Sequence, residues 1–310
     1  MLLLLEFIVG LPVVLVKVVW FIFYGILRYL VPMWLWRKKS VEGEIVLITG
    51  AGSGIGRQIA LNFAKKGAQL VLWDVNGAGN KETARQVREL GAKVWTYECD
   101  VSNRQNVYNT AQKVKHDVGS VTILVNNAGI VSGNYFLDIP DEKIVKTLEV
   151  NTMAHFWTLK AFLPDMIKND HGHIVTIASI VGEGGIGGMT DYCASKCAVK
   201  GLHDSILREM RVMKRNVKCT IVCPYTVTTG MFDGIQVRYQ FLLPFLSPEY
   251  VGKKIVQAVQ TDTDTLYLPP RLVVAMILMH TLPTRTQLVL EGFLNANEAI
   301  KGFVGRGRQR

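Results

Sequence analysis

Tyr192 and Lys196 are the first pair of residues whose types and spacing suggest chemistry. They lie four residues apart in a segment predicted to be helical, so their side chains share one face of that helix. A free phenol has a pKa of about 10 and is a poor base near neutral pH, whereas a neighbouring ammonium group favours the phenolate and lowers that pKa. Ser179 lies 13 residues before Tyr192. Together these residues could exchange a proton with a substrate, although each one alone is a common surface feature.

A glycine-rich loop supplies a second chemical feature. Residues 49–56 read Thr-Gly-Ala-Gly-Ser-Gly-Ile-Gly and lie between a predicted strand and a predicted helix. Glycines let the backbone approach a pyrophosphate closely, and the N-terminus of the helix favours its negative charge. The loop therefore predicts a dinucleotide site.

Asp74 ends the second predicted strand, 18 residues after Gly56. A carboxylate at that position can accept hydrogen bonds from both ribose hydroxyls and repel a 2′-phosphate. No Lys or Arg lies inside the glycine loop or directly after Asp74. The pattern therefore favours NAD over NADP as the cofactor. The alternative interpretation is that Asp74 is only a turn residue ahead of Asn76-Gly77.

The elements that must position these residues are short β-branched runs alternating with helical patterns. The expected strands are Ile45–Ile48, Gln69–Trp73, Lys93–Tyr97, Val121–Val125, Ile174–Ile177, Val217–Val222 and Thr265–Leu268. The expected helices are Ile55–Lys66, Lys81–Leu90, Asn103–Val118, Asp141–Met166, Asp191–Met213 and Glu249–Val259. Apolar strands that alternate with helices imply right-handed crossovers and an α/β fold with a doubly wound parallel sheet. We expect residues 40–270 to form one dinucleotide-binding catalytic domain.

Taken together, these motifs resemble those of the short-chain dehydrogenase/reductase family over residues 41–270. Thr49–Gly56 matches the cofactor loop of that family, Asn126–Gly129 matches its Asn-Asn-Ala-Gly turn, and Asp100 matches an aspartate placed near the adenine. The resemblance implies a seven-stranded, mostly parallel Rossmann sheet. The cofactor contacts that it implies are Gly50, Ser53, Gly54, Ile55, Gly56, Asp74, Asp100, Val101, Asn127, Ala128, Gly129, Tyr192, Lys196, Pro224, Val227 and Thr229.

The same resemblance implies a catalytic tetrad of Asn151, Ser179, Tyr192 and Lys196. Tyr192 would be the general acid/base, and Ser179 would hold the substrate oxygen. Lys196 would lower the pKa of the tyrosine and bind the nicotinamide ribose. Asn151 would hold a water molecule of a proton relay.

Two further segments refine the resemblance. Pro224–Thr229 matches a family segment that contacts the nicotinamide amide, with Tyr225 in place of the usual glycine. Within the family, the chain is similar to membrane-anchored retinol and hydroxysteroid dehydrogenases, for example at Gly43–Gly50 and Asp191–Lys196. Thr229–Phe232 resembles the epidermal-type retinol dehydrogenases more than the lipid-droplet 17β-hydroxysteroid dehydrogenases.

The N-terminal segment, residues 1–39, predicts a retained membrane anchor rather than a cleaved secretory signal. Leu2–Trp36 is almost wholly apolar, and a basic cluster, Arg37–Lys39, follows it. The charged residues that interrupt the apolar run recur every eleven positions and would share one helical face: Glu6, Lys17 and Arg28. Two arrangements remain open, namely a span of about 20 residues, or a hairpin or in-plane helix whose charged stripe faces the headgroups. The basic cluster places the domain that follows on the cytoplasmic side.

The net charge of +10 is concentrated at the two ends of the 310-residue chain. Residues 1–39 carry five cations and one acid, and residues 299–310 carry four cations and no acid. This distribution suits an anionic lipid surface better than nucleic acid. The five cysteines are odd in number and include no Cys-x-x-Cys pair, so we expect neither a disulfide framework nor a metal site.

Residues 271–310 form an expected C-terminal extension that ends in a basic tail. Leu272–Leu294 is again apolar, and His280, Pro283 and Arg285 interrupt it. The pattern predicts either a closing helix packed on the core or a second membrane contact.

The combined pattern predicts hydride transfer between NAD and a lipophilic alcohol, with oxidation of all-trans-retinol to retinal as the first hypothesis. Met231-Phe232 and Tyr239–Leu246 form an apolar insert that we expect to cover the substrate crevice. The alternatives are a 17β-hydroxysteroid dehydrogenase, a reductase that uses NADPH, and a lipid-surface scaffold with a vestigial site. The resemblance also implies a homodimer on the endoplasmic reticulum membrane, with the catalytic domain in the cytosol, or on a lipid droplet.

Overall fold

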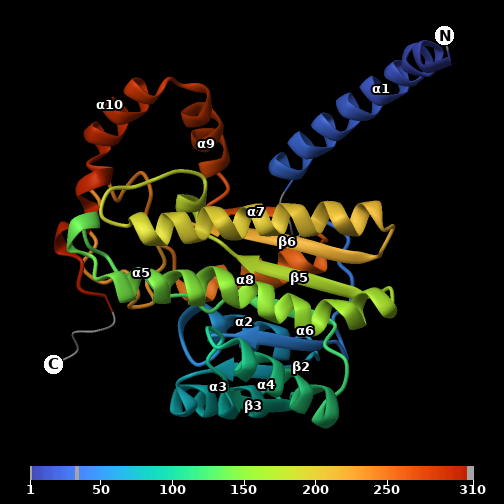
Figure 1. Cartoon of the computed structure of the whole chain (residues 1–310), viewed down its shortest axis with the longest axis vertical. Helices are drawn as coiled ribbons and strands as arrows, with labels where there is room; N and C mark the ends of the chain where they lie inside the picture. The colour runs from blue at the N-terminus through green and yellow to red at the C-terminus, as the bar shows by residue number, and fades with distance from the viewer. Residues whose placement is uncertain (1, 32–34, 306–310) are drawn as a thin grey trace. The chain divides into compact units, whose positions relative to one another are not determined.

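The computed structural model describes residues 2–31 and 35–305. The chain divides into two compact units, residues 1–39 and residues 40–310. The second unit is built on a seven-stranded sheet in the order β3-β2-β1-β4-β5-β6-β7, and every pair of neighbouring strands is parallel (Figure 1). The strands are β1 (Ile45–Thr49), β2 (Gln69–Asp74), β3 (Val94–Glu98), β4 (Ile123–Asn126), β5 (Gly172–Ile177), β6 (Val217–Pro224) and β7 (Thr265–Leu268). The predicted doubly wound α/β sheet is confirmed.

Helices cover both faces of this sheet, which explains why its strands are nearly continuous apolar runs. Side chains of α4, α6 and α7 join the strands in one buried cluster that includes Leu47, Leu124, Val107, Phe162 and Met210. Helix α2 contacts both α3 and α8. The helices around the sheet are α2 (Gly54–Ala64), α3 (Gly77–Glu89), α4 (Arg104–Asp117), α5 (Asp141–Leu148), α6 (Ala154–Lys168), α7 (Thr190–Val212) and α8 (Pro248–Gln260).

Parallel pairing brings the carboxyl ends of all seven strands to one edge of the sheet. β1 ends at Thr49 and runs into the glycine loop, β2 ends at Asp74, and β4 ends at Asn126. Ser179 follows the end of β5 by two residues. The residues predicted to carry chemistry therefore gather at this edge.

The predicted helix Asp141–Met166 is confirmed as one helical segment, but it is not a regular α-helix throughout. Between α5 and α6 the chain forms a π-helical turn, Glu149–Met153. This turn carries Asn151, which is fully buried. A π-helical turn inside a longer helix is a frequent companion of a functional site.

The first unit contains the helix α1 (Leu2–Leu30), with Pro12 inside it. Its described apolar side chains, from Leu11 to Phe23, are exposed. Within the described parts of the chain, no helix combines the length and the apolar character of a membrane span. The side chains of Glu6 and Arg28, on which the predicted charged stripe depends, lie outside the described residues.

Beyond β7 the chain forms two helices, α9 (Leu272–Thr281) and α10 (Thr284–Leu294), which project from the body as an arch (Figure 1). The break between them falls at Leu282-Pro283. Most apolar side chains of the arch face outward, and five of them are 58–72% exposed: Val274, Ile277, Leu278, Val289 and Phe293. The arch is therefore not a closing helix packed on the core. Residues 295–305 then return to the body, and the basic residues beyond them, Arg306, Arg308 and Arg310, lie outside the described residues.

Candidate active site

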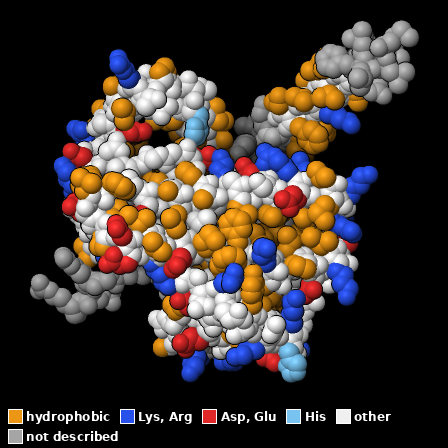
Figure 2. Space-filling view, in the orientation of Figure 1, with side chains coloured by type: hydrophobic (Ala, Val, Ile, Leu, Met, Phe, Trp, Pro, Cys, Tyr) orange, Lys and Arg blue, Asp and Glu red, His pale blue; other side chains and the backbone are white. Residues whose placement is uncertain are grey.

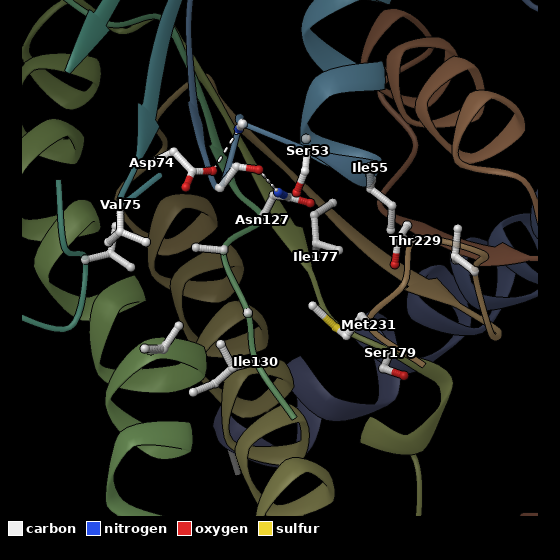
Figure 3. Close-up of a pocket in the computed structure, with 18 of the residues that line it drawn as sticks. Ser53, Ile55, Asp74, Val75, Asn127, Ile130, Ile177, Ser179, Thr229 and Met231 are labelled. Carbon is white, nitrogen blue, oxygen red and sulfur yellow. Dashed lines mark hydrogen bonds between the residues drawn. The ribbon is translucent and has the colours of Figure 1, made fainter. Parts of the chain in front are cut away.

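A cavity of about 530 Å³ opens at the carboxyl edge of the sheet. Asp74 and Val75 lie at one end of it, and Ser179 and Met231 lie at the other (Figure 3). Ser53 and Ile55, from the glycine loop and the start of α2, line the space between those ends (Figure 3). A crevice at the carboxyl ends of parallel strands is where α/β sheets bind dinucleotides.

The glycine loop has the close backbone approaches that its sequence predicts. Gly50 has φ +66°, and a Cβ on it would lie 2.9 Å from the Cα of Ala128. A Cβ on Gly56 would overlap the carbonyl oxygen of Gly50. Glycine at both positions lets the loop pass close to Ala128 and to the start of α2, where a larger residue would not fit. The positive end of that helix then lies against the cavity.

Asp74 receives two backbone hydrogen bonds at the rim of the cavity. Gly52 N donates to Oδ2 at 2.7 Å, and Asn76 N donates to Oδ1 at 2.8 Å. The side chain is thus fixed between the glycine loop and the start of α3, where its free lone pairs can accept further hydrogen bonds. A residue that only formed the turn before α3 would need the contact with Asn76 alone. Asp74 also binds Gly52, so its carboxylate is fixed to the glycine loop as well.

Arg57 is the cation that directly follows the glycine loop. Its Nη2 donates to the carbonyl oxygens of Gly52 and Gly79, and its Nε donates to Thr83 Oγ1 at 3.0 Å. Arg57 is not among the described residues that line the cavity. Its guanidinium therefore holds the loop to α3.

Asp100 follows β3 and lies in the cavity wall beside Val101. Burial raises the pKa of Asp100, but hydrogen bonds from Ser102 and from Lys146 outweigh that effect and lower it. The Nζ of Lys146 lies 3.2 Å from Asp100 Oδ2 and 2.6 Å from Ser102 Oγ. Asp100 is therefore a charged acceptor, and Lys146 is a lining residue that the sequence analysis did not identify.

Asn127 acts on the loop as well as on the cavity. Its Nδ2 donates to the carbonyl oxygens of Thr49 and Gly50, at 2.9 and 3.1 Å. In return, Thr49 Oγ1 accepts from the backbone N–H groups of Asn127 and Ala128. This exchange fixes the end of β4 against the glycine loop.

Tyr192, Lys196 and Ser179 meet at the other end of the cavity. Tyr192 and Lys196 lie near the start of α7, and the ammonium nitrogen is 5.6 Å from the centre of the phenol ring. Lys196 Nζ donates to the carbonyl oxygen of Ile177 at 3.0 Å, which ties α7 to the end of β5. The Ser179 hydroxyl lies beside the hydroxyl of Tyr192, close enough to lower its pKa. The helical spacing and the strand end predicted from the sequence thus bring three potential reactants together.

Burial controls the protonation of this group. It raises the pKa of Tyr192, and the neighbouring Ser179 hydroxyl opposes that rise without cancelling it. Burial also lowers the pKa of Lys196 to about 8. The net direction for Tyr192 is therefore opposite to the lowering expected from the lysine alone, because desolvation disfavours the phenolate.

Asn151 stands behind this group rather than in the cavity. Its Oδ1 accepts from Ile130 N at 2.8 Å, and its Nδ2 donates to Ile130 O and to Ser195 Oγ, at 2.9 and 3.0 Å. The amide thereby fixes the segment after β4 against α7. Its N–H donors are both used in these contacts, so it can offer only a remaining oxygen lone pair to water.

The substrate end of the cavity is lined by apolar side chains from several segments. Phe232 packs its ring at 5.7 Å and 80° against the ring of Tyr192. Tyr225, which departs from the family pattern, donates its backbone N–H to Leu268 O at 2.8 Å. The expected insert returns beside this segment, because Leu246 N donates to Thr226 O and Thr228 N donates to Leu246 O. The walls at this end include Ile130, Ala178, Val227, Met231 and Phe232.

All but two of the sequence-predicted site residues line the cavity; the exceptions are Gly54 and Asn151. The prediction omitted other lining residues, among them Gly52, Val75, Cys99, Ile130, Lys146 and Val150. Gly52 lies within the loop motif and was identifiable from it. The apolar residues were not, because nothing in their sequence separates a cavity wall from a core contact.

Comparisons with known proteins agree with this geometry. A family profile described as short chain dehydrogenase matches residues 44–239. Epidermal retinol dehydrogenase 2 from Homo sapiens is 50% identical over 274 residues, which cover 88% of this chain and 89% of the relative. Retinol dehydrogenase 10 from Homo sapiens is 41% identical, over 96% of this chain and 94% of the relative. A short chain dehydrogenase/reductase from Burkholderia phymatum, solved in complex with NAD, superposes with a TM-score of 0.72 at 28% identity and covers 78% of this chain and 94% of that structure.

Proposed function

This chain belongs to the short-chain dehydrogenase family, and on that premise we propose that it oxidises a lipophilic alcohol with NAD, with all-trans-retinol as the substrate that its relatives indicate. One observation carries the proposal: Tyr192, Ser179 and Lys196 meet at the apolar end of a cavity whose other end is formed by the glycine loop and Asp74. A proton-exchanging phenol and a dinucleotide site thus share one crevice.

The residues present fit a dinucleotide. A Cβ on Gly52 would lie 2.9 Å from Asp74 Oδ2, so a glycine is needed there for the loop, with its backbone N–H groups, to pass this close to the carboxylate. Those groups and the N-terminus of α2 would hold the pyrophosphate, Asp74 would hold the adenosine ribose, and Lys196 would hold the nicotinamide ribose. When bound, the oxidised nicotinamide supplies the acceptor of the hydride.

The chain's own residues handle the proton. An alcohol loses the proton of its hydroxyl as its carbon loses a hydride, and Tyr192 is placed to take that proton. Ser179 is placed to hold the substrate oxygen, because its hydroxyl lies beside the phenol and lines the same cavity. The Ser179 hydroxyl partly offsets the effect of burial on the phenol, and the ammonium of Lys196, 5.6 Å from the ring centre, would also favour the phenolate.

The substrate class follows from the cavity walls. Val227, Met231 and Phe232 surround the catalytic end with apolar surface, which favours a hydrophobic alcohol over a sugar or an acid. The names of two relatives, epidermal retinol dehydrogenase 2 and retinol dehydrogenase 10, direct this chemistry toward retinol.

A substrate panel tests the proposal. NADH formation by the purified full chain should be fastest with all-trans-retinol, slower with a 17β-hydroxysteroid and slowest with a short aliphatic alcohol. Absence of NADH formation with every alcohol in the panel, despite NADH binding, would overturn it. A steroid faster than retinol would instead select the hydroxysteroid alternative.

We also propose that residues 1–39 attach the chain to a membrane, with the arch of α9 and α10 as a second contact. Support comes from the exposed apolar side chains of α1 and the arch, since contiguous exposed apolar surface marks interaction sites. Lys17 and the basic cluster Arg37–Lys39 add the charge that anionic headgroups attract. Such a site would bring the pocket near substrate dissolved in lipid, on the endoplasmic reticulum or on a lipid droplet.

We further propose that the chain forms a homodimer through α6 and α7. These helices share an apolar groove, and Figure 2 shows hydrophobic side chains gathered on their common face. The groove is lined mainly by apolar side chains that include Phe156, Leu163, Ile167, Leu202 and Ile206. An apolar groove on paired helices suits a second copy of the same two helices.

A further inference from the structure

The last described residues, 295–305, form a segment that we name the C-terminal strap. It leaves α10 and returns along the side of the body (Figure 1). It contacts three loops that are far apart in the sequence: the segment after β4, the loop between Ser179 and Tyr192, and the segment that follows Met231. All three loops contribute residues to the substrate end of the cavity or to its immediate support.

Hydrogen bonds fix the strap to two of these loops. Gly187 N donates to Asn297 Oδ1 at 3.0 Å, across 110 residues of sequence. Gln236 N donates to Ala299 O at 3.0 Å, and Val304 N donates to Asp233 O at 2.8 Å. The strap therefore bridges the loop before Tyr192 and the loop after Phe232.

Close packing adds a specific fit. Gly133 and Gly188 have φ of +68° and +79°, and a Cβ on either would overlap the side chain of Phe303 or Ile300 respectively. Glycine is the residue that tolerates both the positive φ and the contact. Phe303 and Ile300 of the strap therefore pack directly against glycines of the opposing loops, where there is no side chain to exclude them.

The contact between Ile300 and Gly188 belongs to the same buried region as Tyr192. Ile300 is buried in a cluster with Met189, Tyr192 and Cys193, and Phe232 packs against it. Phe232 also contacts the ring of Tyr192 edge-on. Ile300 and Phe303 are not among the described residues that line the cavity, so they can act on the reaction only through the residues they support.

We propose that the C-terminal strap is a positioning element of the active site, with Ile300 as the positioning residue for Tyr192 and Phe232. By holding both rings it fixes the orientation of the phenol and the width of the alcohol pocket. The dinucleotide end of the cavity, near Asp74, is independent of the strap. The inference rests on the proposed function, because it concerns turnover of the alcohol.

Kinetics of Ile300→Ala test this inference. A displacement of about 1 Å can cost about 100-fold in rate, so we expect kcat for retinol to fall about tenfold or more. The dissociation constant for NADH should stay within about twofold of wild type. The ratio of kcat/KM for a bulky alcohol to that for a short one should also shift. Ile300→Val should restore most of the activity, and Val212→Ala, which shortens an exposed apolar side chain at the end of α7, should behave as wild type.

Equal kcat values for Ile300→Ala and Val212→Ala would overturn the inference. So would a loss of NADH affinity in proportion to the loss of kcat, since that would indicate general disruption. If Ile300→Ala does not fold, Asn297→Ala carries the test, and wild-type kcat in that variant would overturn the inference. Failure of the wild-type chain to oxidise any alcohol would instead refute the proposed function.

Discussion

The Nζ atom of Lys196 lies 5.6 Å from the centre of the Tyr192 ring and donates a hydrogen bond to the carbonyl oxygen of Ile177. One ammonium group thus connects the catalytic helix to the end of a central strand. Burial raises the pKa of Tyr192 and lowers that of Lys196, whereas the neighbouring Ser179 hydroxyl and, in the proposed mechanism, the charge on the lysine favour the phenolate. The reaction proposed here depends on this balance.

Replacing Asp74 should change the choice of cofactor. Asp74→Ala removes the carboxylate that Gly52 N holds at the rim of the cavity. Because that carboxylate repels a 2′-phosphate and accepts from ribose hydroxyls, the preference for NAD over NADP should fall about tenfold or more. Steady-state kcat/KM with each cofactor measures it. Asp138→Ala, which lies outside the cavity lining, is the control, and an unchanged preference in Asp74→Ala would remove Asp74 from this role.

Two buried histidines should make the fold sensitive to acid. Burial lowers the pKa of His155 to about 3 and that of His203 to about 4. Between pH 6.5 and 4 the unfolded chain binds protons that the folded chain does not, so the free energy of unfolding is constant above pH 6.5 and falls below it. The expected slope is about 1.4 kcal/mol per pH unit for each histidine.

The variant His203→Gln isolates one of these contributions. Its free energy of unfolding, measured by denaturant titration at several pH values, should fall with acid less steeply than that of the wild type. Comparing slopes rather than absolute stabilities removes the cost of the substitution itself, including the lost contact with Thr176 Oγ1. Identical slopes in the two proteins would contradict the prediction.

Much of this architecture was predictable from the sequence, because it depends on patterns among residues that are close together along the chain. The ends of each strand were placed within two residues, because strands buried on both faces are apolar runs bounded by turn residues. Helix α3 begins at Gly77, four residues before the predicted start, because Asn76 caps it by accepting from Gly79 N. Because glycine has a low helix propensity, a helix that begins with Gly77 and Gly79 appears, from propensity alone, to begin later in the sequence.

The features that sequence analysis missed depend on contacts between distant residues. The π-helical turn at Asn151 is held by Ile130 and Ser195, from segments 21 and 44 residues away. The C-terminal strap is held by a hydrogen bond that spans 110 residues. Neither leaves a periodic pattern, so local rules could not find them.

Membrane attachment is expected to depend on the first unit. In alkaline carbonate the full chain should remain with membranes, whereas a chain that begins at Ser40 should be largely released, because it lacks the apolar helix and the basic cluster Arg37–Lys39. Immunoblots of pellet and supernatant measure the distribution. Complete extraction of the full chain would contradict the attachment.

Dimer formation should depend on the groove between α6 and α7. The double variant Leu202→Glu and Ile206→Glu places two charges in that groove, and light scattering should show it as a monomer. Val212→Glu, at the exposed end of α7 with 82% of its side chain accessible, is the matched control and should remain a dimer. A wild-type chain that scatters as a monomer would contradict the proposal.

The most direct test of the central claim is NADH formation from retinol by Tyr192→Phe. This variant keeps the ring that packs against Phe232 and removes only the hydroxyl that takes the proton. We expect kcat to fall by about 100- to 10,000-fold with NADH binding retained, while Tyr250→Phe, on α8 and outside the cavity lining, keeps wild-type turnover. Wild-type kcat in Tyr192→Phe would contradict the account.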